Sequence, residues 1–350
     1  MQNPGRRKNR IITVNIFLLH LRGRFFYGEN TEVIEKKMTR IYLLLCILII
    51  AGCESAYASD NSGITQVTED TRISDVINNP AFGDYGRLLF PLNDGYYSGE
   101  TIGDLRLTWY SNIKPARTVE IINYMLAEVK AGRKIFYRIY PDNDPKARDT
   151  GLFLFRGRAG AKFAVCNAGG GFVYVGAIHD SFPHALELSK RGYNAFALIY
   201  RPGYDTACED LARAIAFIHD NAERLEVDVS GYSLWGGSAG ARMAAWLGSY
   251  GTESFGEDAY PRPAAVIMQY TGLSEVTGNE PPTYSCVGIN DSIAPYGVMQ
   301  RRINRINSNG IDAMIEVFPG LSHGFGLGEG TAAEGWLNNA VKFWAKHSGL

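Results

Sequence analysis

The sequence predicts an α/β fold with a mostly parallel central sheet and helices on both faces of the sheet. Two observations support this prediction. From residue 133 onwards, short apolar runs alternate with longer stretches in which apolar residues recur at helical spacing. Glycine-rich or polar loops follow three of the apolar runs, and an open α/β sheet places its ligand site at the carboxyl ends of its strands.

The individual elements follow from these patterns. Strands are expected at 135–140, 151–155, 162–167, 193–200, 231–235, 264–270, 283–289 and 312–318. A turn-rich segment separates the first two, which should therefore form an antiparallel pair. Helices are expected at 118–129, 180–191, 206–223, 239–247, 295–307 and 331–347. The aromatic-rich segment 74–112 gives no regular pattern.

The N-terminal part divides into three segments. Residues 1–53 are interpreted as an upstream extension and a lipoprotein signal peptide, because a basic stretch precedes the apolar run Ile41–Ile50 and small residues precede Cys53. Translation is then expected to start at Met38, with Cys53 lipidated in the exported protein. A plain signal peptide or a buried helix is the alternative. Residues 54–72 should form a flexible tether and 73–132 an extension packed on the catalytic domain, 133–350.

Composition and cysteine usage narrow the possible partners. The chain is 46% hydrophobic and 20% charged with a net charge of −1, which gives no electrostatic reason to expect nucleic acid. Apart from Cys46 and Cys53, three cysteines remain in the body of the chain. This odd number at wide spacing predicts buried free thiols rather than a disulfide framework. The residues in question are Cys166, Cys208 and Cys286.

A short motif, Tyr232–Gly240, predicts a nucleophile. It reads YSLWGGSAG and contains the pattern GxSxG with Ser238 at its centre. In such an elbow a strand turns abruptly into a helix, and Gly236 and Gly240 leave room where the two nearly touch. Ser238 is therefore the candidate nucleophile, provided that a strand precedes it and a helix follows.

A glycine loop after the strand at 162–167 is the candidate oxyanion hole. Consecutive glycines allow backbone N–H groups to approach a developing oxyanion, so Gly169 and Gly170 are expected to donate, together with the N–H of Ala239. A phosphate-binding loop is the rival interpretation. It is disfavoured because no GK[ST] sequence follows the glycines.

Two further strand ends supply an acid and a base. Asp291 follows the strand at 283–289, where its carboxylate can orient an imidazole, although an aspartate there can also simply cap a helix. His323 follows the strand at 312–318 among glycines rather than on an apolar helix face, which favours a general base. The order Ser238, Asp291, His323 is that of the α/β-hydrolases.

On these motifs, residues from about 133 to 350 resemble the α/β-hydrolase superfamily. The resemblance is to the esterase branch related to hormone-sensitive lipase, acetyl esterases and the bacterial deacetylase/feruloyl esterase group. The matching pieces are AGGGF, Asp210, GGSAG, NDSIAP and LSHGF. Many members begin the glycine loop with a histidine, where this chain has Ala168 after Asn167. The difference bears on how the loop is anchored more than on its backbone donors.

Other residues near the motifs are candidates for weaker roles. Phe172, Trp235 and Phe325 adjoin the three loops and could shape an acyl pocket, although structural packing explains them equally well. His179 and His184 are five positions apart with no third ligand, a poor pattern for zinc. We expect no metal and no cofactor.

The predicted function is hydrolysis of a carboxylic ester through an acyl-enzyme. Ser238 attacks, His323 transfers the proton and Asp291 orients His323. Resemblance and an envelope location suggest a small ester or acylated carbohydrate as substrate, with deacetylation or removal of feruloyl groups from polysaccharide. The alternatives are a peptidase like prolyl oligopeptidase, for which the N-terminal extension is too short to build the propeller, and a catalytically silent surface binding protein.

Overall fold

The structure is a computed structural model that describes residues 63–349. The predictions for the signal peptide, the lipidated Cys53, the start at Met38 and residues 54–62 of the tether fall outside the described residues. Residues 63–72 of the expected flexible tether are described and are packed on the body of the chain, since Val67 is buried and its N–H donates to Asn123 Oδ1 at 2.8 Å. Within the described residues, no helix has the length and apolar character that crossing a membrane requires.

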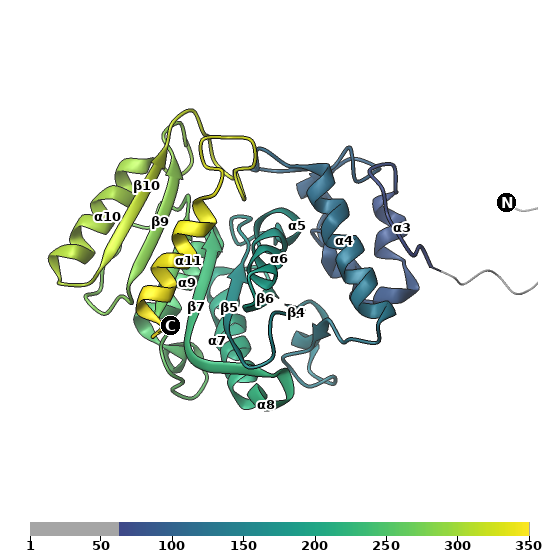
Figure 1. The fold of residues 1–350 in the computed structure, drawn as a ribbon, viewed down its shortest axis with the longest axis horizontal. Coiled ribbons are helices and arrows are strands. Elements are labelled where there is room, and N and C mark those ends of the chain that lie inside the picture. Colours follow the sequence, from purple (N-terminus) through teal and green to yellow (C-terminus); the bar gives the residue numbers. More distant parts are fainter. Residues whose placement is uncertain (1–62, 350) are drawn as a thin grey trace, which may run out of the picture. The chain divides into compact units, whose positions relative to one another are not determined.

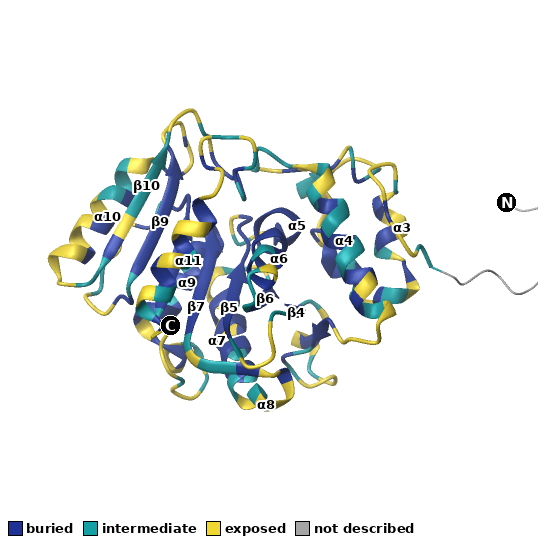
Figure 2. Cartoon of the chain, in the orientation of Figure 1, coloured by how far each residue is buried: buried dark blue, intermediate teal, exposed yellow. Residues whose placement is uncertain are grey.

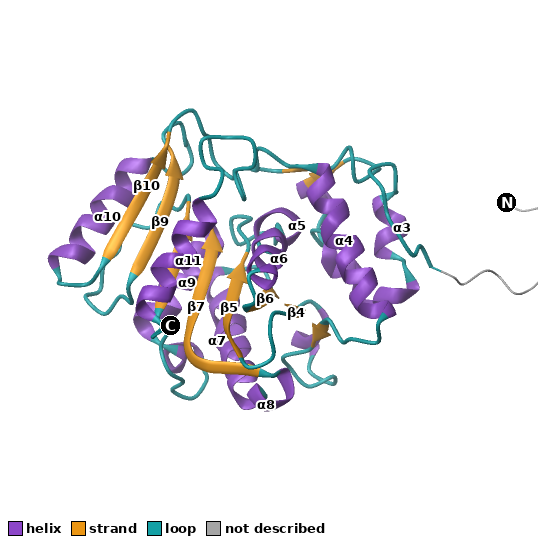
Figure 3. Cartoon of the chain, in the orientation of Figure 1, coloured by secondary structure: helices purple, strands orange, loops and turns teal. Residues whose placement is uncertain are grey.

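An eight-stranded sheet forms the centre of the described part, in the order β10-β9-β8-β7-β5-β6-β4-β3 (Figures 1 and 3). Strands β5 to β10 pair in parallel, whereas β4 pairs antiparallel with both β6 and β3. The strands are β3 Phe136–Tyr137, β4 Gly151–Phe155, β5 Ala161–Asn167, β6 Asn194–Ile199, β7 Val227–Gly237, β8 Ala265–Gln269, β9 Thr283–Gly288 and β10 Ala313–Phe318. The predicted α/β fold with a mostly parallel sheet is confirmed.

Helices cover both faces of this sheet. Helices α7 and α9 pack against each other on one face, and α6 and α11 lie on the other, while α10 packs on β9 and β10 (Figure 1). This division follows from right-handed crossovers between parallel strands. The helices are α5 Ala177–Asp180, α6 Phe182–Lys190, α7 Tyr204–Asp220, α8 Ala222–Leu225, α9 Ala239–Tyr250, α10 Tyr296–Ser308 and α11 Trp336–His347, with 3-10 turns η4 Pro145–Arg148 and η5 Thr252–Phe255.

The core runs along the middle of the sheet. Every residue of β4, β6, β8 and β9 is buried, because helices cover these strands on both sides (Figure 2). Asp210 of α7 is also fully buried and accepts hydrogen bonds from the Arg201 guanidinium and the Tyr140 hydroxyl. It therefore fixes the loop after β6 rather than serving the chemistry directly.

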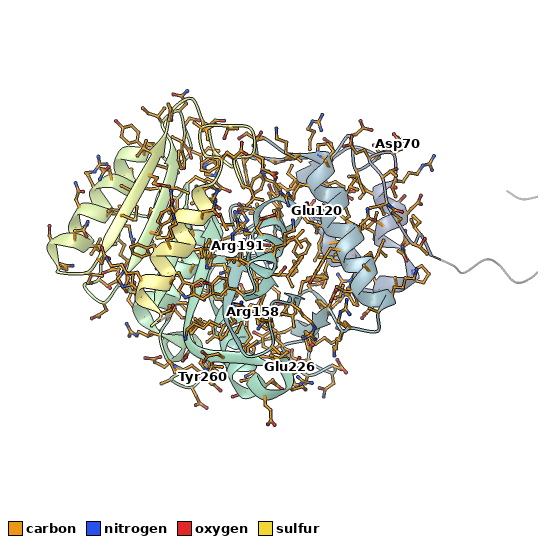
Figure 4. All side chains as sticks on the ribbon, in the orientation of Figure 1. Asp70, Glu120, Arg158, Arg191, Glu226 and Tyr260 are labelled. Carbon is orange, nitrogen blue, oxygen red and sulfur yellow. The ribbon has the colours of Figure 1, made fainter. Side chains whose placement is uncertain are left out.

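Residues 63–132 contribute to the same core. Their elements are α3 Ile73–Ile77, η2 Pro80–Leu89, η3 Asp94–Tyr96, β1 Tyr97–Ser98, β2 Arg106–Leu107 and α4 Pro115–Lys130. Buried side chains of α4, such as Ile121 and Met125, join the apolar cluster of the sheet. Ion pairs also link α4 to α6: Arg117 pairs with Glu187 and Glu120 with Lys190 (Figure 4 labels Glu120).

Several boundaries differ from the sequence-based expectations. The first antiparallel pair is short, since β3 spans two residues of the expected 135–140. The helix expected from 180 is split, with a break at Ser181 between α5 and α6. The last helix begins at Trp336 rather than 331, because Gly335 has a positive φ of 86° and cannot continue a helix before it.

Candidate active site

Ser238 lies at the tip of a sharp turn between β7 and α9. Its φ of 51° and ψ of −112° are strained for a residue with a side chain. The glycines around it are required by close approach: a Cβ on Gly236 would lie 2.3 Å from the backbone of Gly240, and a Cβ on Gly240 would lie 2.0 Å from the carbonyl oxygen of Asn167. The turn has the geometry of a nucleophile elbow, with the predicted strand before it and the predicted helix after it.

The structure brings Ser238, His323 and Asp291 together. His323 Nε2 lies 3.0 Å from Ser238 Oγ, and His323 Nδ1 lies 2.8 Å from Asp291 Oδ2. His323 and Asp291 are 7% and 4% exposed, so little water competes for these hydrogen bonds. With the proton on Nδ1 donated to Asp291, Nε2 is free to accept the proton of the serine hydroxyl. These are the contacts of a serine-hydrolase triad.

Asp291 is held by the backbone of its own loop. Its Oδ1 accepts hydrogen bonds from the N–H of Ile293 at 2.9 Å and of Ala294 at 2.7 Å, which leaves Oδ2 for His323. Asp291 therefore has both of the roles that the sequence left open. Its Oδ1 caps the backbone of the loop, and its Oδ2 orients His323.

The oxyanion loop, residues 168–172 after β5, differs from the prediction in one donor. The N–H of Gly169 donates to Asp180 Oδ2 at 2.7 Å, so it is already engaged. Within residues 63–349, the N–H groups of Gly170 and Gly171 have no acceptor, and Ala239 stands in the first turn of α9, where an N–H has no partner inside the helix. The three available donors are thus Gly170, Gly171 and Ala239. A Cβ on Gly169 would lie 2.8 Å from the Cβ of Ser238, which puts the loop directly beside the nucleophile.

Side chains from other elements anchor this loop, where many of the esterases that the motifs resemble have a histidine. The hydroxyl of Tyr200 donates to the carbonyl oxygen of Ala168 at 2.7 Å, and the side-chain amide of Asn167 donates to the carbonyl oxygen of Trp235 at 2.8 Å. Both bonds are buried. The loop therefore has a fixed start even with alanine in the position of the histidine.

Asp180 forms a buried acidic centre under the elbow. It is 2% exposed and accepts from Gly169 N–H, from the Tyr110 hydroxyl at 2.9 Å and from the Tyr270 hydroxyl. Burial raises the pKa of this carboxyl to about 6, although its three donors and the nearby His323 oppose the rise. A Cβ on Gly237 would lie 2.3 Å from Asp180 Oδ2, so the carboxylate touches the strand that leads to Ser238.

The sequence prediction missed Asp180 and also the segment around Tyr110. Trp109 and Ser111 flank Tyr110, and Ser111 Oγ donates to the carbonyl oxygen of His323 at 2.8 Å. The ring of Trp109 is 46% exposed and lies next to the glycine loop, since a Cβ on Gly171 would approach it to 2.9 Å. No local pattern signals these contacts, because they join positions far apart in the chain.

Two of the three predicted pocket residues belong to the core instead. Trp235 is 2% exposed; its Nε1–H donates to Ser233 Oγ at 2.7 Å and its ring packs near Trp336. Phe325 is fully buried with its ring edge-on to Tyr270. Phe172 is half-buried on the oxyanion loop with φ of 61° and stacks on Trp246. Of the three, Phe172 alone keeps surface next to the loop.

The histidines near the site have structural surroundings. His179 Nε2 lies 3.1 Å from the carbonyl oxygen of Gly324, and burial lowers the pKa of His179 to about 4. Burial likewise lowers the pKa of His184 to about 3, so both are neutral at pH 7. In the part of the chain that the structure describes, no three His, Cys, Asp or Glu side chains are grouped so that they could hold a metal ion.

Comparisons with known proteins agree with this fold. A family model described as BD-FAE matches residues 157–296, which contain the glycine loop, the elbow and Asp291. The chain is also similar to the thermophilic esterase Est2 of Thermogutta terrifontis with propionate bound, with a TM-score of 0.53, 21% identity and coverage of 60% of this chain and 93% of that one. The same esterase phosphorylated by paraoxon matches at 20% identity, with a TM-score of 0.53, 61% of this chain and 96% of that one covered.

Two further relatives widen the comparison. MGS-M1, an α/β-hydrolase enzyme from a Medee basin deep-sea metagenome library, matches with a TM-score of 0.52 at 18% identity, over 61% of this chain and 98% of that one. A curated relative, endo-1,4-beta-xylanase B of Butyrivibrio fibrisolvens, is 24% identical over 210 residues, covering 48% of this chain. The matched part spans 33% of that relative, about a third of its length.

Proposed function

We propose that this chain, which has the fold of the α/β-hydrolases it is similar to and a region that matches the BD-FAE family model, is a serine esterase that removes acyl groups from acylated carbohydrate. The observation that carries the ester-hydrolase part is the hydrogen-bonded series from Ser238 Oγ through His323 to Asp291, with its contacts of 3.0 and 2.8 Å. The strained turn at Ser238 supports the same role, because strain of this kind is kept at functional positions.

The proposed reaction proceeds through an acyl-enzyme. Ser238 Oγ attacks the ester carbonyl carbon while His323 Nε2 takes the hydroxyl proton, and the N–H groups of Gly170, Gly171 and Ala239 stabilise the oxyanion. As the tetrahedral intermediate collapses, the C–O bond to the alcohol breaks and His323 returns the proton to the leaving oxygen. Water then attacks the acyl-enzyme by the same steps and releases the acid. Asp291 stabilises the imidazolium in both halves.

Ser238→Ala tests this assignment. It should abolish turnover of p-nitrophenyl acetate to the level left by binding alone, a loss of roughly 10³-fold or more. Circular dichroism should be unchanged, because the substitution removes one hydroxyl. An organophosphonate should label the parent at Ser238 and leave the variant unlabelled. Equal hydrolysis by both proteins would refute the assignment, and a parent that resists the reagent would favour a silent binding protein.

The carbohydrate part of the proposal is supported by the surface beside the oxyanion loop. Trp109 presents an exposed ring there, backed by Tyr174 with ring centroids 5.9 Å apart, while Tyr174 in turn stacks on Tyr96 at 4.8 Å. A rigid aromatic face of this kind suits the apolar face of a sugar ring that carries the ester. The similarity to a xylanase and to a BD-FAE domain points in the same direction.

A substrate panel separates the possible acyl groups. The full chain would be assayed with acetyl, butyryl and feruloyl esters and with acetylated xylan. We expect release of acetate from the polysaccharide and a preference for short acyl chains among simple esters. Trp109→Ala should raise KM for acetylated xylan by a larger factor than KM for p-nitrophenyl acetate, because only the polysaccharide offers a sugar ring to the aromatic face. A preference for long acyl chains would contradict the carbohydrate proposal.

We further propose that the protein is exported and anchored in the cell envelope by lipid on Cys53. The basic and apolar stretches before Cys53 support this location. Radiolabelled palmitate should be incorporated into the parent and not into Cys53→Ala expressed in a bacterial host. Equal labelling of both would overturn the proposal.

A further inference from the structure

We propose that the strap, which we define as residues 109–112 of the N-terminal extension, is a positioning element of the active site. It holds the oxyanion loop and the histidine loop, residues 320–326 after β10, in place relative to each other. This inference rests on the proposed ester hydrolysis and adds to it residues that do not themselves touch the reacting atoms. The strap reaches both loops by separate hydrogen bonds, one through Tyr110 and one through Ser111.

The first connection passes through Asp180. The Tyr110 hydroxyl donates to Asp180 Oδ2 at 2.9 Å, and the same oxygen accepts the N–H of Gly169 at 2.7 Å. Gly169 directly precedes Gly170 and Gly171. The hydrogen bond at its N–H therefore fixes the position from which the chain continues to the next two N–H groups. Both groups meet on one buried carboxylate oxygen, so Tyr110 limits where the oxyanion loop can lie.

The second connection reaches the histidine loop. Ser111 Oγ donates to the carbonyl oxygen of His323 at 2.8 Å, and the N–H of Ser111 donates to the carbonyl oxygen of Gly324 at 3.1 Å. These two bonds hold the backbone carbonyl groups of His323 and of the residue that follows it. They therefore act on the position of His323 through its main chain, whereas Asp291 acts on its ring.

Steric fit shows how closely the strap enters the site. A Cβ added to Gly169 would lie 2.8 Å from the Tyr110 hydroxyl, one added to Gly176 would lie 2.6 Å from the Tyr110 ring, and one added to Gly324 would lie 2.7 Å from the backbone of Trp109. Glycine stands at each of these positions. The strap therefore fits against the oxyanion loop, the start of α5 and the histidine loop only because these three positions carry no side chain.

The backbone of the strap is strained on both sides of Tyr110 and Ser111. Trp109 has φ of 69°, a value that bulky residues rarely adopt, and Asn112 has φ of 58°, which asparagine adopts more readily than most residues. Such conformations persist where the surroundings over-determine them, and they concentrate at functional sites. The strain is independent of the hydrogen bonds above and supports a positioning role rather than a covering loop.

Paired substitutions in the full chain test the proposal. Tyr110→Phe should lower kcat for p-nitrophenyl acetate about tenfold, because a loosened donor loop loses part of a contribution that reaches 10²–10³ for one oxyanion donor. Ser111→Ala should lower kcat by about threefold or more through the histidine loop. In both variants KM should change less than twofold, since the strap contacts positioned groups rather than a simple ester.

Tyr124→Phe is the matched control. Tyr124 lies in the same extension, on α4, and its hydroxyl accepts the N–H of Arg156 at 3.1 Å, away from the three loops. If the extension acted through stability alone, Tyr110→Phe and Tyr124→Phe would behave alike. Under the proposal Tyr124→Phe keeps parental kcat.

The pH profile gives a readout that a purely structural role would not move. Tyr110→Phe removes a donor that holds the pKa of Asp180 down. Because an ionised Asp180 is the stronger acceptor for the N–H of Gly169, the acid limb of kcat should move to higher pH in this variant and not in Tyr124→Phe. The other titratable groups that act on Asp180, or on which it acts, are unchanged in both variants: His323, Tyr270, Tyr174, Tyr200, Cys166 and Cys286.

The outcomes separate this inference from the proposed function. An active parent with Tyr110→Phe and Ser111→Ala within twofold of Tyr124→Phe overturns the strap and leaves the esterase intact. A parent that neither hydrolyses esters nor reacts with an organophosphonate overturns the function itself. If Tyr110→Phe does not fold, the kcat of Ser111→Ala decides: a loss of threefold or more supports the proposal, and parental kcat refutes it.

Discussion

The buried carboxyl of Asp180 predicts how stability depends on pH. Its pKa rises from an ordinary 3.8 to about 6 in the folded protein, chiefly because of burial. At roughly 1.4 kcal/mol per pH unit this rise corresponds to about 3 kcal/mol. Since the folded state binds the proton more tightly than the unfolded one, the contribution is fully present below pH 3.8 and is lost as the pH rises through about 6.

Asp180→Asn removes this titration and serves as the reference. Urea unfolding of the parent and the variant would be measured at pH 4.5 and pH 7, and the difference between their unfolding free energies compared. The unfolding free energy of the parent should fall by about 2 kcal/mol relative to that of the variant between these two pH values, because about two thirds of the contribution of Asp180 is lost in this interval. Other carboxylates cancel in the difference.

Asp228→Asn is a control of opposite sign. Asp228 is half-exposed, and hydrogen bonds from Ser230 and Lys162 lower its pKa despite some burial. The unfolding free energy of the parent should therefore rise slightly relative to that of Asp228→Asn as the pH rises through the acid range. For Asp180, an unfolding free energy of the parent that stays constant or rises relative to that of Asp180→Asn between pH 4.5 and 7 would refute the prediction. It would mean that the three hydrogen-bond donors lower the pKa of Asp180 more than burial raises it.

Three further predictions follow from packing. Gly240→Ala should eliminate turnover and lower the melting temperature, because its Cβ would meet the carbonyl oxygen of Asn167 at 2.0 Å; a variant with parental kcat would contradict the elbow geometry. Trp235→Ala should lower the unfolding free energy measured in urea by about 3–5 kcal/mol, the cost of leaving a core site empty. A loss under about 1 kcal/mol would contradict the burial of Trp235. Cys208 should not react with a disulfide dye until urea unfolds the protein, since burial raises its pKa to about 12; rapid labelling of the folded chain would refute its burial.

The triad could be found in the sequence because each member follows its own strand. Ser238, Asp291 and His323 stand in loops next to apolar runs, and parallel strands bring those loops to one edge of the sheet. The fold could be predicted from the sequence for the same reason. The boundaries of the helices were harder to predict, because the positive φ of Gly335, which delays the start of the last helix, cannot be derived from composition.

The pocket could not be predicted from adjacency to the motifs. β7 is buried on both faces where it approaches the elbow, so apolar periodicity does not tell which side of the sheet Trp235 occupies. The donors in the glycine loop posed a similar problem. Gly169, Gly170 and Gly171 are identical in sequence, and only the buried carboxylate of Asp180 distinguishes the first from the other two.

The strap was invisible because its partners are distant in the chain. The segment 74–112 forms 3-10 turns and two-residue strands, which leave no periodic signal. Tyr110 contacts Asp180 across 70 positions, and the positive φ at Trp109 comes from tertiary packing, since the tryptophan side chain does not favour it. Sequence patterns report local structure, whereas these contacts are products of the assembled fold.

The bond between Ser111 Oγ and the carbonyl oxygen of His323 joins positions 212 residues apart. Ribosomes make Ser111 well before His323, so this contact can form only after the 212 positions that follow Ser111, up to His323, have been added. A nascent or truncated chain that stops before His323 has its nucleophile but neither its base nor the hydrogen bonds that hold that base in place. The proposed hydrolytic activity therefore requires that β10 has joined the sheet and that the strap, made much earlier, has closed on the loop that follows β10.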